Sequence, residues 1–175
     1  MMSTGESAVH DFAARQLNRG LAADPGLRAQ AEAIYESGFG DIDPSFPGFV
    51  GQYYLLSKLI PKDRVVYDMG CSYGLQAWFF RDHCKYIGVD LPNDAVRRLR
   101  MPNAEYHEMS IGDFLATATI DPKHFAICNY VPPWEDDNER LVAEAFRHMF
   151  IFYPMGDPWS PFVEIEMAKP TKENA

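Results

Sequence analysis

The sequence predicts an α/β fold: a mostly parallel sheet with helices on both faces and a helical N-terminal extension. From residue 64 onward, short apolar runs of strand length alternate with segments of helical pattern. The first sixty residues, by contrast, carry helical patterns alone. The last two strand-like runs, 149–153 and 162–167, are joined by eight residues that include three prolines. Since a crossover helix does not fit there, the final strand should run antiparallel to its neighbour.

Apolar residues at helical spacing and the positions of Pro and Gly define the expected N-terminal helices. These helices cover 6–19, 25–37 and 52–60. The stretch 38–51 is rich in Gly, Pro, Asp and Phe and is expected to be a loop. We therefore assign residues 1–61 to a helical extension or lid and residues 62–175 to the core.

Runs rich in apolar, β-branched and aromatic residues define the expected strands of the core. These strands cover 64–69, 85–90, 104–109, 124–129, 149–153 and 162–167. Helices are expected between them at 75–83, 93–100 and 135–147, with about one further helical turn after Gly112. Helix 135–147 is acidic at its start and basic at its end, which suits the helix dipole.

The charge and composition of the chain exclude some classes of binding partner. The chain has 175 residues, 16 Lys and Arg and 25 Asp and Glu, and therefore a formal net charge of −9. So acidic a chain is a poor match for tight, sequence-blind binding to duplex nucleic acid or for an anionic membrane surface. The sequence contains neither an apolar run of membrane-spanning length nor a secretory signal, and its three cysteines form no CxxC pair. These features predict a cytoplasmic protein without a structural metal site or disulfides.

The most informative stretch is Tyr67-Asp68-Met69-Gly70-Cys71-Ser72-Tyr73-Gly74, in which an expected strand runs into a turn of small residues. Such a turn lets the backbone approach a ligand closely. One interpretation is the dinucleotide fingerprint G-x-G-x-x-G, but its third glycine would fall on Leu75. The match to pyrophosphate binding is therefore weak.

A second interpretation is a nucleophile elbow, since Gly70 to Gly74 reads G-x-S-x-G. Asp113 and then His124 or His148 follow Ser72 in the order that a hydrolase triad requires. A hydrolase would, however, have several strands before its elbow, whereas this chain has sixty residues of helical pattern. The elbow is therefore the least supported interpretation.

The third interpretation rests on a family resemblance. Residues 66–74 resemble the first motif of the class I S-adenosylmethionine (SAM) dependent methyltransferases, apolar-x-(Asp/Glu)-x-Gly-x-(Gly/Ser)-x-Gly, with Ser72 at the middle small position. The resemblance covers about residues 62–154. It implies a Rossmann-like sheet of order 3-2-1-4-5 and SAM as the cofactor. The cofactor contacts that it implies are Asp68, Gly70, Ser72, Gly74, Asp90, Asp113 and Asn129.

Three acids carry distinct roles in that resemblance. Asp90 would accept hydrogen bonds from the two ribose hydroxyls, although a NAD-binding fold also places an acid there. Asp113, in Gly112-Asp113, would contact the adenine amino group. Asp68 would contact the methionine amino group, brace the glycine turn, or do both. For Asp90 and Asp113 the plain structural alternative is a helix cap or a solvated turn.

The end of the fourth expected strand, Asn129-Tyr130-Val131-Pro132-Pro133-Trp134, resembles the (Asn/Asp/Ser)-Pro-Pro-aromatic motif of amino-group methyltransferases. Pro132, Pro133 and Trp134 match, whereas Val131 stands at the polar position. Asn129 and Trp134 are the candidate catalytic residues. Asn129 would contact cofactor or substrate, and Trp134 would be either a stacking platform or a wedge that closes the sheet.

Together these features predict a SAM-dependent methyltransferase acting on a small-molecule, nucleotide or protein acceptor. The alternative, motivated by Val131 and a core that ends soon after its sixth strand, is a module that binds SAM or a partner protein without catalysis. Phe46, Gln52 and Tyr53 would form a lid over the cofactor or simply pack against the sheet. A sheet edge left open by the short C-terminal part could be covered by pairing in a homodimer.

Overall fold

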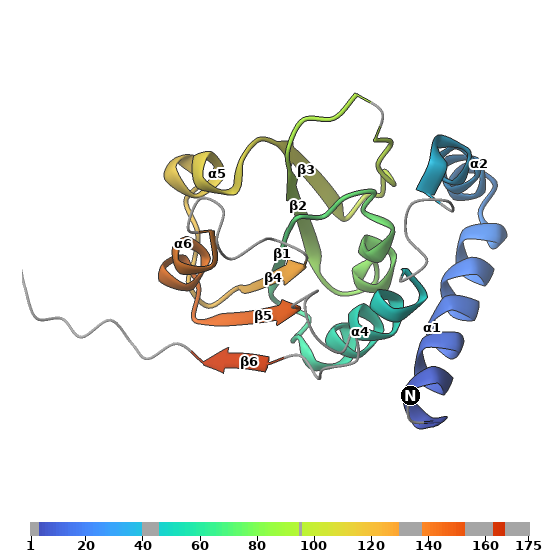
Figure 1. Ribbon diagram of the computed structural model, residues 1–175, viewed down its shortest axis with the longest axis horizontal. Helices are drawn as coiled ribbons and strands as arrows, with labels where there is room; N and C mark the ends of the chain where they lie inside the picture. Colours follow the sequence, from blue (N-terminus) through green and yellow to red (C-terminus); the bar gives the residue numbers. More distant parts are fainter. Residues whose placement is uncertain (1–3, 40–45, 95, 130–137, 153–162, 167–175) are drawn as a thin grey trace, which may run out of the picture.

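The computed structural model describes residues 4–39, 46–94, 96–129, 138–152 and 163–166. Six strands form one sheet in the order β3-β2-β1-β4-β5-β6 (Figure 1). The strands are β1 (Val65–Met69), β2 (Lys85–Asp90), β3 (Ala104–Glu108), β4 (Phe125–Asn129), β5 (His148–Phe152) and β6 (Val163–Glu166). The first five are parallel and β6 is antiparallel to β5. The predicted sheet order and the predicted direction of the last strand are confirmed.

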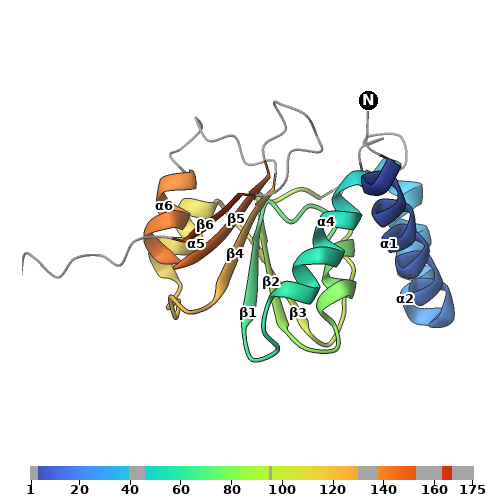
Figure 2. The ribbon, with the colours of Figure 1, turned by 90° about the horizontal axis from the view of Figure 1, so that it is seen from below.

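Helices cover both faces of this sheet, as predicted. Figure 2 shows α5 and α6 on one face and α4 on the other, with α1 and α2 outside α4. The helical elements are α1 (Thr4–Ala23), α2 (Pro25–Ile34), the π-helical turn η1 (Tyr35–Phe39), α4 (Phe46–Leu59), the 3₁₀ helix η2 (Leu75–Phe80), α5 (Ile111–Thr117) and α6 (Asn138–Ala145). None of the described helices is both long and apolar enough to cross a membrane.

Two apolar clusters fill the two faces of the sheet, because successive side chains of a strand point to opposite sides. In β1, Val66 belongs to the cluster under the N-terminal helices, whereas Tyr67 and Met69 belong to the cluster under α5 and α6. The first cluster also contains Leu17 of α1 and Leu56 of α4. The N-terminal helices therefore share a core with the sheet, and the division of the chain at residue 61 remains a prediction.

Two local predictions were wrong. The expected helix at 93–100 is absent from the described residues, where the segment is irregular. The Gln30 side chain makes two hydrogen bonds with the backbone of Arg100, and the Leu99 N–H donates to the Tyr73 carbonyl at 3.0 Å. These partners replace the bonds that a helix would have formed.

The expected loop at 38–51 is also too long, because α4 begins at Phe46. A proline in the first turn of a helix loses no hydrogen bond, which makes Pro47 compatible with this start. Farther along, the α-carbon of Gly51 lies against the His10 ring of α1, where an added Cβ would be 2.0 Å from Nδ1. Glycine has a low helix propensity, which is why the sequence pattern predicts a loop here. The close packing of α4 against α1 is compatible with glycine and favours the helix instead.

We predict that Gly20→Ala destabilises the protein by about 2 kcal/mol. Alanine is ordinarily the better helix former, but its Cβ would lie 1.9 Å from Cζ2 of Trp78, where α1 crosses η2. The control is Gly112→Ala in α5, where the nearest atom would be 3.8 Å away and the same change should be neutral or stabilising. Urea denaturation of both variants measures the difference, and equal stability of Gly20→Ala and wild type would contradict the packing described for α1.

Candidate functional site

The turn that follows β1 lies where the strand order reverses between β1 and β4. In open α/β sheets this is the place where ligands bind. The turn needs left-handed backbone at three positions: Gly70 has φ 85°, Ser72 has φ 46° and Gly74 has φ 67°. Gly70 and Gly74 adopt such angles without strain, whereas Ser72 is the only described non-glycine residue with positive φ. The small residues singled out in the sequence are therefore used to reverse the chain tightly at this crevice.

Four backbone N–H groups of this turn are already occupied by partners in the protein. Those of Gly70 and Cys71 donate to the Val89 carbonyl at 2.8 and 3.2 Å, and that of Gly74 donates to the Cys71 carbonyl at 3.0 Å. The Ser72 N–H donates to Oδ2 of Asp90 at 2.6 Å. A pyrophosphate bound in such a turn needs free N–H groups. The turn is therefore poorly suited to a dinucleotide, in agreement with Leu75 at the third glycine position.

Asp90 stands at the carboxyl end of β2, is partly exposed, and borders the turn. Its Oδ2 accepts the Ser72 N–H and its Oδ1 accepts the N–H of Leu91 at 2.8 Å. A carboxylate offers about four lone-pair directions, so two remain for further donors. The two backbone bonds fix the orientation of the carboxylate, as a site that binds paired hydroxyls requires.

Asp68 lies beneath the turn and is completely buried. It accepts hydrogen bonds from the Tyr53 hydroxyl at 3.0 Å, from Nε2 of Gln76 at 2.8 Å and from the Tyr86 hydroxyl. Gln76 also donates to the Cys71 carbonyl at 2.8 Å, which ties the carboxylate to the turn itself. Of the two predicted roles, this geometry describes the bracing of the turn.

Burial raises the pKa of Asp68 from 3.8 to about 6, even though its three hydrogen bonds act in the opposite direction. The carboxylate of Asp90 contributes further to the rise. Asp68 is therefore a buried acid that changes charge near neutral pH.

We predict that Asp68 makes the protein more stable below pH 3.8 than above pH 6. Because its pKa is raised on folding, the folded state holds the proton more tightly, and this stabilisation is lost as the pH rises through about 6. The expected loss over this range is about 3 kcal/mol. The pKa values of His83 and His124 are lowered mainly by burial. These two groups therefore make the protein more stable as the pH rises, over a pH range that overlaps that of Asp68.

The measurement is therefore the difference in unfolding free energy between wild type and Asp68→Asn, followed by urea denaturation from about pH 4 to about pH 7. The asparagine retains a hydrogen-bond acceptor but does not titrate. A pH-independent difference between the two proteins would contradict the raised pKa of Asp68.

Asp113 lies in the first turn of α5 and is exposed. Its backbone N–H donates to Oγ of Ser110 at 3.0 Å, and the Ser110 hydroxyl donates to Oδ2 of Asp113 at 2.8 Å. The two residues thus form a reciprocal cap at the start of the helix. α5 follows β3, whose end is joined to β2 through the Met109 N–H and the Asp90 carbonyl at 2.9 Å. Asp113 and Asp90 therefore border the same end of the sheet.

The remaining predicted residues are placed only in part. Asn129 ends β4 and pairs in register with Phe152, while its side chain and all of Trp134 lie outside the described residues. The backbone of Phe46 opens α4, and its side chain also lies outside the description. Gln52 is buried, and among the described residues its Oε1 has no hydrogen-bond partner.

Gln76 and Tyr86 are two site residues that the sequence analysis missed. A signal for Tyr86 was available, because a tyrosine inside a buried strand needs a partner for its hydroxyl. Gln76 follows the turn immediately, in η2, and only the tertiary structure shows that it joins the turn to Asp68.

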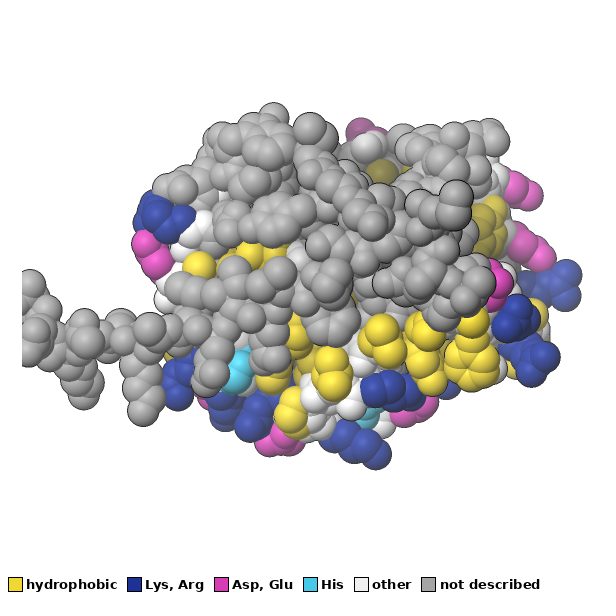
Figure 3. All heavy atoms as spheres, turned by 60° about the horizontal axis from the view of Figure 1, so that its bottom comes forward, with side chains coloured by type: hydrophobic (Ala, Val, Ile, Leu, Met, Phe, Trp, Pro, Cys, Tyr) yellow, Lys and Arg dark blue, Asp and Glu magenta, His cyan; other side chains and the backbone are white. Residues whose placement is uncertain are grey.

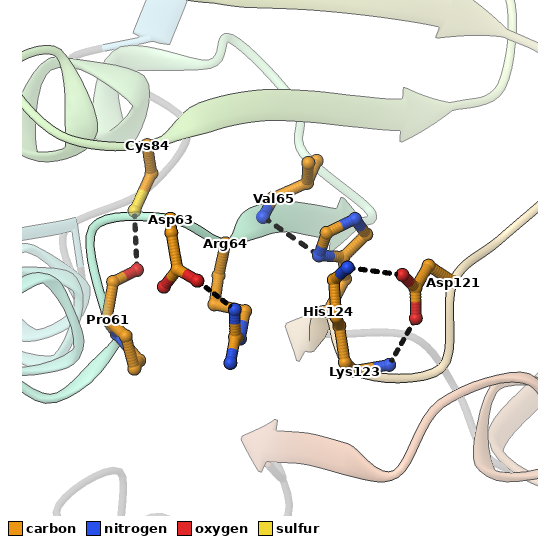
Figure 4. A network of polar contacts seen from close by, with 8 residues as sticks. All are labelled: Pro61, Asp63, Arg64, Val65, Cys84, Asp121, Lys123 and His124. Carbon is orange, nitrogen blue, oxygen red and sulfur yellow. Dashed lines mark hydrogen bonds and ion pairs between the residues drawn. The ribbon is translucent and has the colours of Figure 1, made fainter.

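The structure disagrees with the nucleophile-elbow interpretation. His124 precedes β4, and its Nδ1 accepts the Val65 N–H at 3.2 Å at the amino end of β1 (Figure 4). His148 is the first residue of β5. Both histidines therefore lie at the end of the sheet opposite Ser72. That distance keeps them from forming a catalytic triad with the Ser72 hydroxyl.

Comparison with solved structures identifies the architecture. The chain is similar to a proposed O-methyltransferase from Klebsiella pneumoniae, with 13% identity and a TM-score of 0.52, over 77% of this chain and 69% of that one. It is also similar to the cofactor-bound Rv0187 protein from MTB, with 14% identity and a TM-score of 0.52, over 73% and 65% of the two chains. The chain has the class I methyltransferase fold.

At these low sequence identities, the similarity to the solved structures establishes the fold and nothing further. The chain spans less than two thirds of the Rv0187 protein. It also spans only 61% of a precorrin 8W decarboxylase from Methanobacterium thermoautotrophicum, matched at 12% identity and a TM-score of 0.44 over 57% of this chain. No protein-family model matches the chain, and no curated protein sequence does. Within this fold, the glycine turn, Asp90 and Asp113 occupy the carboxyl end of the sheet.

Proposed function

We propose that this chain is a SAM-dependent methyltransferase that binds the cofactor at the glycine turn. The acceptor would be a small molecule, a nucleotide or a protein. The predicted cofactor residues are Asp68, Gly70, Ser72, Gly74, Asp90, Asp113 and Asn129. Asn129 and Trp134 remain the proposed residues on the acceptor side. Cofactor, acceptor and catalysis are all parts of this proposal.

One observation carries the choice of cofactor class. At the strand-order reversal, the turn uses four of its N–H groups internally and presents the Asp90 carboxylate beside them. Such a site offers acceptors for hydroxyl groups and a negative potential, whereas four N–H groups that a pyrophosphate could have used are already bonded within the protein. A nucleoside that carries a positive charge, as SAM does on its sulfonium, fits this chemistry.

When bound, SAM supplies an electrophilic methyl group. The protein would then position the two reactants and exclude water, since in-line displacement needs a general base only for some acceptors. Asp90 would hold the ribose hydroxyls, and its own backbone bonds keep its carboxylate in place. Asp68 would act from below by keeping the turn in shape through Gln76.

A module that binds SAM without transferring the methyl group is the second candidate. It is favoured by Val131, which occupies the position where amino-group methyltransferases carry a polar residue. Both candidates share the cofactor site and differ in turnover.

Titration calorimetry of the purified chain with SAM and with NAD tests the cofactor. The expected result is saturable binding of SAM in the micromolar range and no measurable binding of NAD, and the reverse result would reject the proposal. Turnover of methyl-labelled SAM over small-molecule, nucleotide and protein acceptors then separates the two candidates. Label transfer to any acceptor supports the enzyme, whereas binding without transfer to all of them supports the module.

A further inference from the structure

A hollow lies at the amino-terminal end of the sheet, opposite the glycine turn. It is a cavity of about 630 Å³ between α1, α4, η2 and the residues before β2. We call it the aromatic groove and define it by Phe12, Tyr54, Lys58, Leu59, Lys62, Trp78, Phe79 and Arg81. None of these residues belongs to the candidate cofactor site. The inference drawn from the groove therefore stands independently of the proposed methyl transfer.

Aromatic rings build the floor of the groove. Tyr54 contacts Phe12 and Phe79 edge to face, with ring centroids 5.5 and 6.1 Å apart, and Phe79 contacts Trp78 in the same way at 5.3 Å. Trp78 and Phe79 are buried, whereas Phe12 is 42% and Leu59 is 59% exposed. The groove thus has a rigid floor and an apolar rim that is open to a partner.

Positive charge surrounds this apolar rim. The Lys58 ammonium lies 5.1 Å from the Tyr54 ring centre, and the Arg81 guanidinium lies 3.7 Å from the Trp78 ring centre. Arg81 also pairs with Asp82 at 3.2 Å, while no carboxylate among the described residues pairs with Lys58 or Lys62. Figure 3 shows exposed hydrophobic side chains beside Lys and Arg on this side of the molecule.

This local charge is opposite to that of the whole chain, whose net charge is −9. Three cations against one acid would attract an anionic partner and orient it toward the groove. The contacts of Lys58 and Arg81 with the rings hold these two cations in place before binding, which lowers the entropy lost when a partner docks.

The free apolar surface decides which kind of partner fits. Arg81 covers the Trp78 ring and Lys58 lies over the Tyr54 ring, so neither ring offers a bare face on which a nucleobase could stack. Phe12 and Leu59 remain as the exposed contacts, and they suit an aliphatic or aromatic side chain. We propose that the aromatic groove docks an acidic amphipathic segment of a partner protein, with apolar side chains against Phe12 and Leu59 and carboxylates facing Lys58 and Lys62.

Fluorescence anisotropy tests the groove with an amphipathic helical peptide of about 18 residues that carries Leu on one face and Glu on the other. The comparison probes are the same peptide with Lys in place of Glu, polyglutamate, and a single-stranded RNA. The protein variants are Lys58→Glu with Lys62→Glu, and separately Leu59→Asp. Arg97→Glu, an exposed arginine outside the groove, is the matched control for charge reversal.

The expected result is binding of the Glu peptide in the micromolar range, weakened at least about tenfold by each groove variant and unchanged in the control. Circular dichroism checks that each variant is folded. Absent binding of the Glu peptide, equal binding of the Lys peptide or polyglutamate, or preferential binding of RNA would overturn the proposal. Because SAM is absent from this assay, its outcome is separate from that of the cofactor titrations.

Discussion

Replacing Asp68 with alanine is expected to lower the free energy of unfolding by about 4 kcal/mol. The side chain is fully buried and accepts from three donors, which come from α4, η2 and β2. Removing the carboxylate leaves the hydroxyls of Tyr53 and Tyr86 and the amide of Gln76 without this partner in an apolar interior. Each hydrogen bond lost by a buried donor costs about 1–3 kcal/mol, and neighbouring losses are not additive.

Thermal and urea denaturation measure this loss, with Asp94→Ala as the control because Asp94 is an exposed acid on the loop after β2. Asp68→Asn should lose less than the alanine variant, because an amide still accepts one or two of the bonds. Should the alanine variant be as stable as the control, Asp68 would not brace the turn in the way described.

Replacing Asp90 with alanine is expected to weaken SAM binding by about a hundredfold, which corresponds to about 2.7 kcal/mol. The proposed site would lose two hydrogen bonds to ribose hydroxyls made by an ionised acceptor. It would also lose the contact of Asp90 with the Ser72 N–H, which helps to fix the turn. Titration calorimetry measures the affinity directly.

A stability check separates the two contributions of Asp90. Asp90→Asn keeps an acceptor for the Ser72 N–H but loses the charge, so it should weaken SAM binding less than alanine does while folding normally. Asp94→Ala serves here too as the neighbouring acid and should bind as the wild type does. Wild-type affinity in Asp90→Ala with the fold intact would remove the ribose role from this residue.

Much of the sheet could be predicted from the sequence because its signals are local. The run 85–90 was predicted as a strand and is β2 with the same bounds, since a continuous buried run of strand length and a terminal acid are written into six consecutive residues. The antiparallel last strand also followed from a local feature, the short proline-containing connection before it. By contrast, segment 93–100 has a helical composition but forms irregular structure, because Gln30 from a distant helix bonds to its backbone.

The candidate site likewise contains residues that could be placed from the sequence and contacts that could not. Gly70, Ser72, Gly74 and Asp90 could be placed from their spacing, because a strand, a tight turn and a second parallel strand bring them together in any fold of this class. The bonds of Asp68 to Tyr53 and Tyr86 join residues 15 and 18 positions away, and neither spacing follows from a helix or strand period. Packing of α4 on the sheet decides the bond to Tyr53, and the register between β1 and β2 decides the bond to Tyr86.

The sequence alone determined the α/β class, the position of the glycine turn and the acids that border it, because each depends on residues close together in the chain. Only the tertiary structure decided that the turn uses its own N–H groups, that Asp68 is buried beneath it, and that aromatic and basic residues of α1, α4 and η2 form a groove at the other end of the sheet. The physical reason is that hydrophobic periodicity specifies which side of an element is buried, whereas the partner that each buried polar group meets depends on how separate elements pack.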